Sequence, residues 1–442
     1  GARTADERDA AIARLERGEL QVLCTVDLFN EGVDIPPVDT VLFLRPTESA
    51  TVFLQQLGRG LRLHKSKPCL TVLDFIGNAR REFRFDRRFR VLLGGTTKGV
   101  ERQVTQDFPY LPPGCAMHLD AIARQTVLEN IRRGVRSGKK WLTEELRALG
   151  PTCTLRKFLE EVGVDASELY DSKRSFTSLY MGAFGGELKD EESKLHGRLG
   201  AMLHINDEER LRLLREWTEA PPRLSELSER ERRIARMVTA SFVDRPTDMD
   251  ASFSQLFALP RLRAELRALL ELLDDTRREH TEPLPAPETA PLHVHGRYRQ
   301  EEILAALDVY RNGTLPRVQG GTFPVNDAQD LVFVTLRKTE KTFSPSTMYR
   351  DYAISPTRFH WESPNNWHAD TKAGRKLLEG RSTTLLFARE VQHQANGIAE
   401  AYVFLGPGRL VEARSGRPMQ VVWQLARPMP TWLFQRASLA AG

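Results

Sequence analysis

The first hundred residues alternate a helical pattern with short apolar runs, and this alternation constrains the fold more than any other feature of the chain. The helical pattern spans Ala5 to Arg17, and the apolar, β-branched runs are Leu20 to Val26, Thr40 to Leu44 and Leu70 to Ile76. Apolar runs separated by helix-length segments are typical of a parallel sheet covered on both faces. We therefore predict an α/β unit over residues 1–100.

Three regions with different patterns follow this unit. Residues 101–281 contain leucines at helical spacing and predict an all-α region. Residues 282–291 hold four prolines and no aromatic residue, which predicts an extended linker. Residues 292–442 contain short β-type runs broken by glycine and proline, and they predict a mostly antiparallel sheet or small barrel. The expected fold class is a multidomain chain with α/β, all-α and mostly-β parts.

Composition narrows the class of protein. A chain of 442 residues is expected to form two to four domains. No run approaches the roughly 20 apolar residues of a membrane span, so we expect no membrane insertion. The four cysteines are far apart and form no CxxC pair, which argues against a disulfide framework or zinc ribbon and favours the reducing cytoplasm. The net charge of +5 favours polyanionic partners.

Two stretches near the start carry the most specific chemical signal. One is VLCTVDLFNEGVDIPPVDTVLFL, from Val22 to Leu44, and the other is FLQQLGRGLR, from Phe53 to Arg62. Arg59 and Arg62 are three residues apart and so share one side of a helix. Two permanently charged guanidinium groups on one side suit the γ-phosphate of a nucleotide. The alternative is an arginine-rich surface helix with no ligand.

In this order the two stretches resemble motifs V and VI of the second RecA-like lobe of superfamily-two helicases. The resemblance implies that Arg59 and Arg62 form the arginine-finger pair at ATP bound between two lobes. It makes Gln55 a companion polar contact and places Gly32 and Asp34 near the nucleotide.

The same resemblance implies contacts to nucleic acid. The segment from Thr25 to Asn30 falls where the motif V loop meets the nucleic-acid backbone. Val26, Asp27 and Glu31 stand where DEAD-box RNA helicases usually carry Thr-Asp and then Arg, so the stretch looks more like DNA-translocating and DNA-repair members. This departure favours DNA over RNA as the partner.

The first helicase lobe has no counterpart in the sequence. No GxxxxGK[ST] phosphate loop and no DEAD-like Mg²⁺ motif occur anywhere. We therefore expect the C-terminal half of a helicase, which uses ATP and Mg²⁺ only in the intact enzyme and does not hydrolyse ATP alone. The partners implied by the resemblance are a missing N-terminal helicase lobe and DNA.

The rest of the chain resembles a second known arrangement. LLFARE, YVFLGP and PMQVVWQL, at 385–390, 402–407 and 418–425, resemble a C-terminal domain of unknown function attached to bacterial helicases. DFPYLPPGC and LHINDEERL, at 107–115 and 203–211, fit the same proteins. Those helicases often carry a phospholipase-D-like nuclease and occur in restriction or phage defence, so the resemblance implies such a partner domain and setting.

The segment from Phe343 to His368 has the most unusual composition of the C-terminal part, because it is dense in aromatic residues. Rigid rings beside hydrogen-bonding and basic groups suit an unstacked nucleotide, by stacking and by edge and phosphate contacts. The equally weighted alternative is that the rings fill a small β core. The candidate nucleic-acid contacts here are Arg350, Tyr352, Arg358, Trp361 and Trp367.

The region from Arg297 onward holds 19 Lys+Arg and 13 Asp+Glu, a difference of +6, and is expected to bind DNA. A second basic segment, Arg80 to Arg90, has interleaved phenylalanines; we expect its rings to pack inward and its arginines to cover the outer face.

Other chemistries receive less support. Asp351, Glu362 and Glu390 could form a nuclease-like carboxylate set, but no lysine follows at the ExK position, and we reject that set. His293 and His295 lie beside the proline-rich segment without further ligands, so we expect a disordered pair and no metal. Two alternatives to the helicase reading stay open: a stand-alone nucleic-acid or protein-binding module without motor activity, and a nuclease with its active site in the C-terminal domain.

Overall fold

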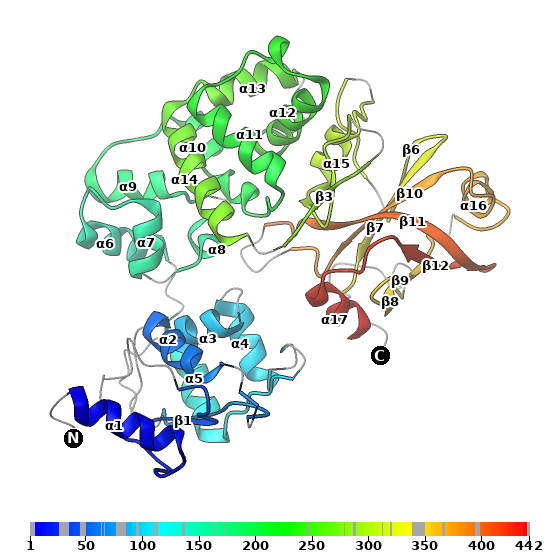
Figure 1. Ribbon diagram of the computed structural model, residues 1–442. Coiled ribbons are helices and arrows are strands. Elements are labelled where there is room, and N and C mark those ends of the chain that lie inside the picture. Colours follow the sequence, from blue (N-terminus) through cyan, green and yellow to red (C-terminus); the bar gives the residue numbers. More distant parts are fainter. Residues whose placement is uncertain are drawn as a thin grey trace. The chain divides into compact units, whose positions relative to one another are not determined.

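The computed structural model divides the chain into two units, Gly1–Arg136 and Ser137–Gly442, which are described separately (Figure 1). It describes residues 5–25, 35–44, 50–62, 64–65, 67–76, 85–93, 97–108, 111, 114–134, 138–162, 164–171, 173–244, 246, 248–277, 279–285, 289–311, 313–318, 321–337, 350–364, 367–393 and 398–439.

The first unit contains a β-α-β arrangement followed by three packed helices. Strands β1 and β2 pair in parallel, and α2 lies between them in sequence. Helices α3, α4 and α5 share a core of Phe85, Phe89, Val104, Val127 and Ile131. The elements are α1 (Ala5–Glu16), β1 (Thr40–Phe43), α2 (Ala50–Gly60), β2 (Thr71–Asp74), α3 (Phe85–Leu93), α4 (Thr97–Thr105) and α5 (Ala121–Gly134).

Most of the predicted α/β pattern is present in this unit. The helix expected at Ala5 to Arg17 ends one residue earlier, and two of the three expected strands form. The strand predicted from Leu20 is wrong for residues 20–25, which form no strand. Val22 is 70% exposed, so this apolar run lacks the burial that stabilises a central strand. The unit extends past the predicted boundary at residue 100 because α4 and α5 complete its core.

The second unit begins with the predicted all-α region. Many of its helices start at a residue whose side chain accepts a backbone N–H, as Asp207 does for α11 and Ser228 for α12, which satisfies donors left free by the first helical turn. Leu262, Leu266 and Leu269 of α14 are buried, as their spacing predicts. The helices are α6 (Lys139–Leu149), α7 (Leu155–Val162), α8 (Ala166–Leu169), α9 (Phe176–Phe184), α10 (Asp190–His196), α11 (Glu208–Glu219), α12 (Glu229–Phe242), α13 (Met249–Phe257) and α14 (Pro260–Thr276), with 3-10 turns η1 (Leu199–Met202) and η2 (Leu224–Glu226).

An eight-stranded mixed sheet forms the C-terminal part of this unit. Its strand order is β6-β7-β10-β11-β12-β9-β8, and β5 also pairs with β11. The predicted, mostly antiparallel sheet is confirmed, with β7 and β10 as a parallel pair. The elements are β5 (Arg297–Tyr298), α15 (Gln300–Ala306), β6 (Thr322–Asn326), β7 (Gln329–Thr335), β8 (Tyr352–Ser355), β9 (Arg358–Glu362), α16 (Lys372–Leu378), β10 (Thr383–Arg389), β11 (Tyr402–Arg414), β12 (Gln420–Leu425) and α17 (Thr431–Leu439).

The proline-rich segment does not behave as the predicted linker. Its strand β3 (Glu282–Pro283) pairs with β4 (His293–Val294), and Leu284 and Ala290 are buried. One hydrophobic core runs from the helices through this segment to the sheet residues Phe333, Phe387 and Phe404. The expected boundary at residues 282–291 is therefore absent from the described structure, because apolar packing crosses it.

Among the described residues, no helix combines the length and the apolar character needed to cross a bilayer.

Candidate functional site

The FLQQLGRGLR stretch lies on α2 and the turn that follows it. Gln55 and Arg59 belong to α2, and Arg62 comes two residues after the helix ends. The side chains of Gln55 and Arg62 are exposed. The structure thus brings the three predicted ATP contacts onto one short stretch, although the Arg59 side chain lies outside what it describes.

The motif V residues are placed only in part. Thr25 is exposed and lies in an irregular segment. Asn30, Gly32 and Asp34 lie outside the described residues, so their predicted roles stay predictions.

A buried cation holds α2 against the two strands. Arg88 of α3 is 4% exposed, and its Cζ lies 3.7 Å from the ring centroid of Phe53 on α2. Its Nη2 lies 2.7 Å from the Asp74 Oδ2 at the end of β2, and Phe43 at the end of β1 packs 5.3 Å from Phe53, ring centroid to centroid. The ion pair and the two rings join β1, α2, β2 and α3 beneath the FLQQLGRGLR stretch.

Burial opposes the charges of this pair. It raises the pKa of Asp74 and lowers the pKa of Arg88, and in each case the partner charge acts in the opposite direction. Removing Asp74 would leave the buried Arg88 cation without its compensating charge, whereas Asp74 is itself an exposed residue of β2.

The role of Arg88 differs from the sequence prediction. Phe85 and Phe89 pack inward as expected, but Arg88 lies buried with them instead of covering the outer face of α3. Its spacing of three from Phe85 places it on the apolar side of the helix, and this spacing was a signal that could have identified it.

The predicted C-terminal contacts separate into exposed and buried residues. Arg350 and Arg358 are exposed, and Tyr352 is half-buried. The Tyr352 ring stacks on that of His360 with centroids 4.5 Å apart and planes 17° apart. His360 Nδ1 lies 3.0 Å from the carbonyl oxygen of Arg350, which ties the segment before β8 to β9.

Trp361 and Trp367 are not available as stacking faces. They are 2% and 7% exposed, and the rings of Trp367 and Trp423 lie 6.4 and 6.2 Å from that of Trp361. Alternation along β9 explains this, because Phe359 and Trp361 point to the core of α17 while Arg358 and His360 point the other way. For these two rings the structure contradicts the recognition prediction and favours the core alternative.

The rejected carboxylate set has structural roles. Asp351 Oδ1 accepts a hydrogen bond of 3.1 Å from the backbone N–H of Glu362. Glu390 is buried and pairs with Arg436 and with Arg337, the latter at 3.5 Å. The described part of the chain contains no group of three His, Cys, Asp or Glu residues that could hold a metal ion.

His293 is also ordered by a carboxylate, contrary to the predicted disordered pair. It is 5% exposed, and its Nε2 lies 2.8 Å from Glu209 Oε2. Arg230 donates to both oxygens of the same carboxylate at 2.6 Å. Burial raises the pKa of Glu209, but the hydrogen bonds from His293 and Arg230 outweigh it and hold the pKa at about 2.

The LHINDEERL stretch at 203–211 joins the helices to the C-terminal part. Buried Arg210 pairs with Asp207 at 2.5 Å and donates to the carbonyl oxygen of Arg297 at 2.6 Å. His204 Nε2 lies 2.6 Å from Oε2 of Glu302 on α15. The other oxygen of this carboxylate accepts a hydrogen bond from the Ser241 hydroxyl. These charged groups are satisfied by one another across the contact between helices and sheet.

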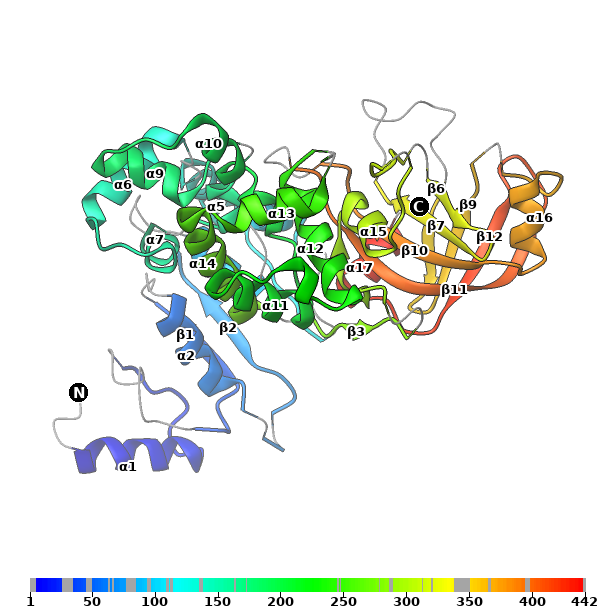
Figure 2. The ribbon, with the colours of Figure 1, turned by 90° about the horizontal axis from the view of Figure 1, so that it is seen from above.

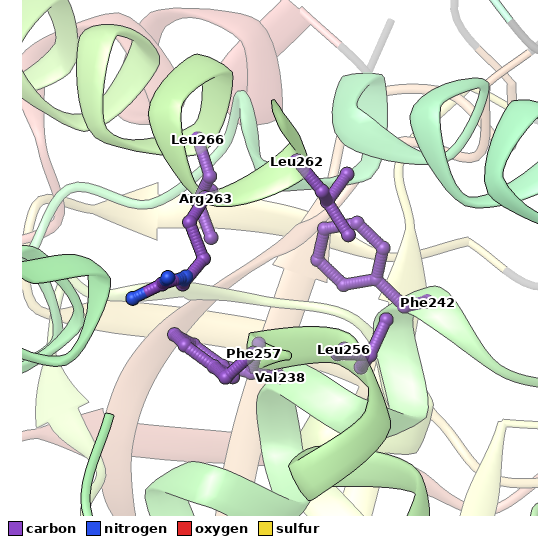
Figure 3. A pocket seen from close by; sticks show the side chains of 7 residues that line it. All are labelled: Val238, Phe242, Leu256, Phe257, Leu262, Arg263 and Leu266. Carbon is purple, nitrogen blue, oxygen red and sulfur yellow. The ribbon is translucent and has the colours of Figure 1, made fainter. Parts of the chain in front are cut away.

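One apolar hollow lies between α12, α13 and α14 (Figure 3). Arg263 is the single polar side chain in its lining, and its Nη1 already donates to the carbonyl oxygen of Thr218 at 3.4 Å. This hollow lacks the convergent polar groups that orient a ligand. Its lining is Val238, Phe242, Leu256, Phe257, Leu262, Arg263 and Leu266.

Comparisons with known proteins identify both ends of the chain. Residues 1–64 match the helicase conserved C-terminal domain, and residues 292–437 match a domain of unknown function, DUF3427. The chain is 46% identical over 71 residues to the candidate ATP-dependent helicase IRC3 of Saccharomyces cerevisiae, covering 16% of this chain and 10% of that protein.

Two further relatives match the same share of the chain or slightly more. A "51.5 kDa protein" of a Lactococcus phage is 37% identical over 73 residues, or 16% of each chain. The pre-mRNA-splicing ATP-dependent RNA helicase prp28 of Aspergillus clavatus is 33% identical over 86 residues, or 20% of this chain and 10% of that protein. The chain thus spans between about a tenth and a sixth of the length of these relatives.

These matches show a chain that begins with a part similar to helicase C-terminal domains. More specifically, the chain combines a RecA-like helicase C-terminal domain, a helical region and a DUF3427 domain. The resemblance inferred from the two motifs is confirmed at this level.

Proposed function

We propose that this chain is the C-terminal portion of an ATP-dependent DNA helicase or translocase that acts in the cytoplasm. The observation that carries the proposal is the anchoring of α2 by Arg88, since it holds the stretch with Gln55, Arg59 and Arg62 on a fixed support within the helicase C-terminal domain. Preorganised cations stabilise developing charge during phosphoryl transfer without reorganising at the moment of reaction.

The residues present fit a nucleoside triphosphate. Exposed Gln55 can donate or accept a hydrogen bond, and exposed Arg62 presents a guanidinium fork that matches phosphate oxygens. With Arg59, they would hold the γ-phosphate from the side of this lobe. Bound Mg²⁺ would neutralise charge between the β- and γ-phosphates, and its ligands would come from the first helicase lobe.

The C-terminal sheet supplies the second part of the proposal. The basic excess after Arg297 and the exposed Arg350 and Arg358 favour a polyanion, and we assign DNA as that polyanion. The departure of the motif V stretch from DEAD-box helicases supports DNA over RNA. A role in restriction, phage defence or repair, beside a phospholipase-D-like nuclease domain, follows from the family resemblance alone.

The test uses the protein that carries both helicase lobes. Arg62→Ala should reduce DNA-stimulated ATP turnover by about 10³-fold or more, because one arginine finger supplies an effect of this order. Arg14→Ala on α1 is the matched control, since Arg14 is an exposed arginine of the same unit whose Nε lies 3.6 Å from a carboxylate oxygen of Glu19. Unchanged turnover in Arg62→Ala would refute the motor assignment, and RNA added in place of DNA tests the choice of nucleic acid.

A further inference from the structure

The C-terminal sheet has two faces with different surroundings. Residues of one face, on the strands from β7 to β8, share a hydrophobic core with Leu377 of α16 and with Leu433 and Ala437 of α17. The other face is covered at β7, β10 and the first half of β11 by the core shared with α15 and the helices. Figure 2 shows α15 beside the helical region and α16 at the opposite end of the sheet. The strands β8, β9, β12 and the outer half of β11 continue beyond that cover.

Register places a set of mostly polar side chains on one face of these strands. Gln424 of β12 pairs with Arg358 of β9 on one side and with Arg409 of β11 on the other. Two residues away along β12, Val422 pairs with His360 and with Glu412 in the same way. Because side chains on one face recur every second residue, these two rows lie on one face.

A third row completes the set. Gln420 pairs with Glu362 and with Arg414. The intervening residues Phe359, Val421 and Trp423 are buried on the opposite face. The second face of these strands therefore carries three arginines, Arg358, Arg409 and Arg414, and all three side chains are exposed. We call this surface the arginine face.

The acidic residues of the arginine face do not cancel its charge. The Glu362 carboxylate accepts a hydrogen bond of 2.9 Å from the backbone N–H of Arg350, which adds a fourth exposed arginine at the edge. Glu412 is the other acidic residue of the three rows. With Asp351, whose Oδ1 accepts from the backbone N–H of Glu362, four arginines stand against three carboxylates, and a positive excess remains.

The arginine face also holds an aromatic ring in a fixed orientation. Tyr352 on β8 is paired in register with His360, and the two rings stack. The contact between His360 Nδ1 and the Arg350 carbonyl oxygen fixes the orientation of the His360 ring on which Tyr352 stacks. A half-exposed ring held this way can take a stacked base at low entropic cost.

We propose that the arginine face binds single-stranded nucleic acid, with phosphates on Arg358, Arg409 and Arg414 and a base on Tyr352. This inference rests on the proposed function and names the ligand of its C-terminal domain. Rings and arginines interleaved on an open sheet suit a strand whose bases are unstacked, whereas a duplex keeps its bases stacked inside and would use the arginines alone.

The experiment measures binding of the full chain to a fluorescent oligothymidine without ATP. The double variant Arg358→Glu/Arg409→Glu should weaken binding at least about 10-fold and flatten the salt dependence, with a slope of log K against log salt smaller by about 1.4, or about 0.7 for each lost phosphate contact. The matched control is Arg375→Glu/Arg381→Glu, which changes the net charge equally at two exposed arginines on or next to α16. It should change affinity less than about 2-fold.

The ring is tested separately. Tyr352→Ala should weaken oligothymidine binding about 5-fold or more, while Tyr352→Phe, which keeps the ring, should bind as the wild type does. Tryptophan fluorescence melting confirms that each variant is folded, because all six tryptophans lie in Ser137–Gly442. Equal losses in both double variants, absence of oligothymidine binding, or tighter binding of duplex with no effect of Tyr352→Ala would each overturn the proposal.

This outcome is separate from that of the motor proposal. If Arg62→Ala retains ATP turnover while the arginine-face variants lose oligothymidine, the motor assignment fails and the binding surface stands. If Arg62→Ala loses turnover and the arginine-face variants bind normally, only the surface fails.

Discussion

The guanidinium carbon of Arg88 lies 3.7 Å from the ring centroid of Phe53, and this contact links the third helix of the chain to the helix that carries Gln55 and Arg59. Phe53 precedes Gln55 by two residues, so a shift of its ring moves the stretch that we assign to ATP. The support of that stretch is thus a cation buried between two helices and two strands.

Replacing Arg88 by Met should remove the cation and leave Asp74 without its partner. We expect the first unit to lose roughly 1 to 2 kcal/mol of stability, mainly from the lost cation-π contact, because the Asp74 carboxylate is partly hydrated. Hydrogen exchange should be faster in α2 and β2 than in the wild type. Asp74→Asn in the Arg88→Met background should recover part of the loss, and unchanged exchange in Arg88→Met would contradict the anchoring role.

Trp361→Ala separates core packing from recognition. The Trp361 ring is 2% exposed and packs beside the rings of Trp367 and Trp423. We therefore expect its removal to lower the free energy of unfolding of the second unit by about 3 to 5 kcal/mol. Oligothymidine affinity of the folded fraction should be unchanged. A weaker affinity without loss of stability would return Trp361 to the binding surface.

Truncation at residue 292 should fail where truncation at residue 137 succeeds. A chain of residues 292–442 exposes Tyr298, Phe333 and Phe404, which pack in the core shared with the helices. We expect this fragment to bind a hydrophobic dye and to lack a cooperative transition, whereas residues 137–442 should unfold cooperatively. Cooperative unfolding of the shorter fragment would show that the shared core is dispensable.

Acid should destabilise the second unit through Glu209. Its pKa is held at about 2 in the folded protein, below the value of 4.5 for an unperturbed Glu side chain, so its contribution to stability is full above pH 4.5 and is lost as the pH falls toward 2. Glu209→Gln should therefore lose less stability than the wild type between pH 6 and pH 3, measured by denaturant titration of tryptophan fluorescence. Glu216→Gln, at an exposed glutamate of the same helix paired with Arg212, should keep the wild-type dependence.

The sequence pattern predicted the element types better than the boundaries between units. Periodicity identified the buried leucines of α14 and the phenylalanines of α3, because both depend on local spacing. It could not show that Leu284 and Ala290 pack between helices and sheet, since proline content reports local chain stiffness and carries no information on long-range packing.

The candidate site residues also divide into those that local sequence identifies and those that depend on long-range packing. The order of the two helicase motifs assigns the stretch around Arg62 to an ATP site, and this role stays a prediction. Aromatic density from Phe343 to His368 could not separate Tyr352 from Trp361, because which side of β9 is buried depends on the register with β12 and on the position of α17. Arg409 and Arg414 were missed since their neighbours in space are far away in sequence.

The core that crosses residues 282–291 bears on how such chains are assembled in evolution. A recombination breakpoint near residue 136 transfers the second unit whole, whereas one near residue 291 separates two halves of a single core. In this chain the DUF3427 match at residues 292–437 therefore covers only part of the unit Ser137–Gly442, and a transfer that begins at residue 292 would leave behind the helices that complete its core.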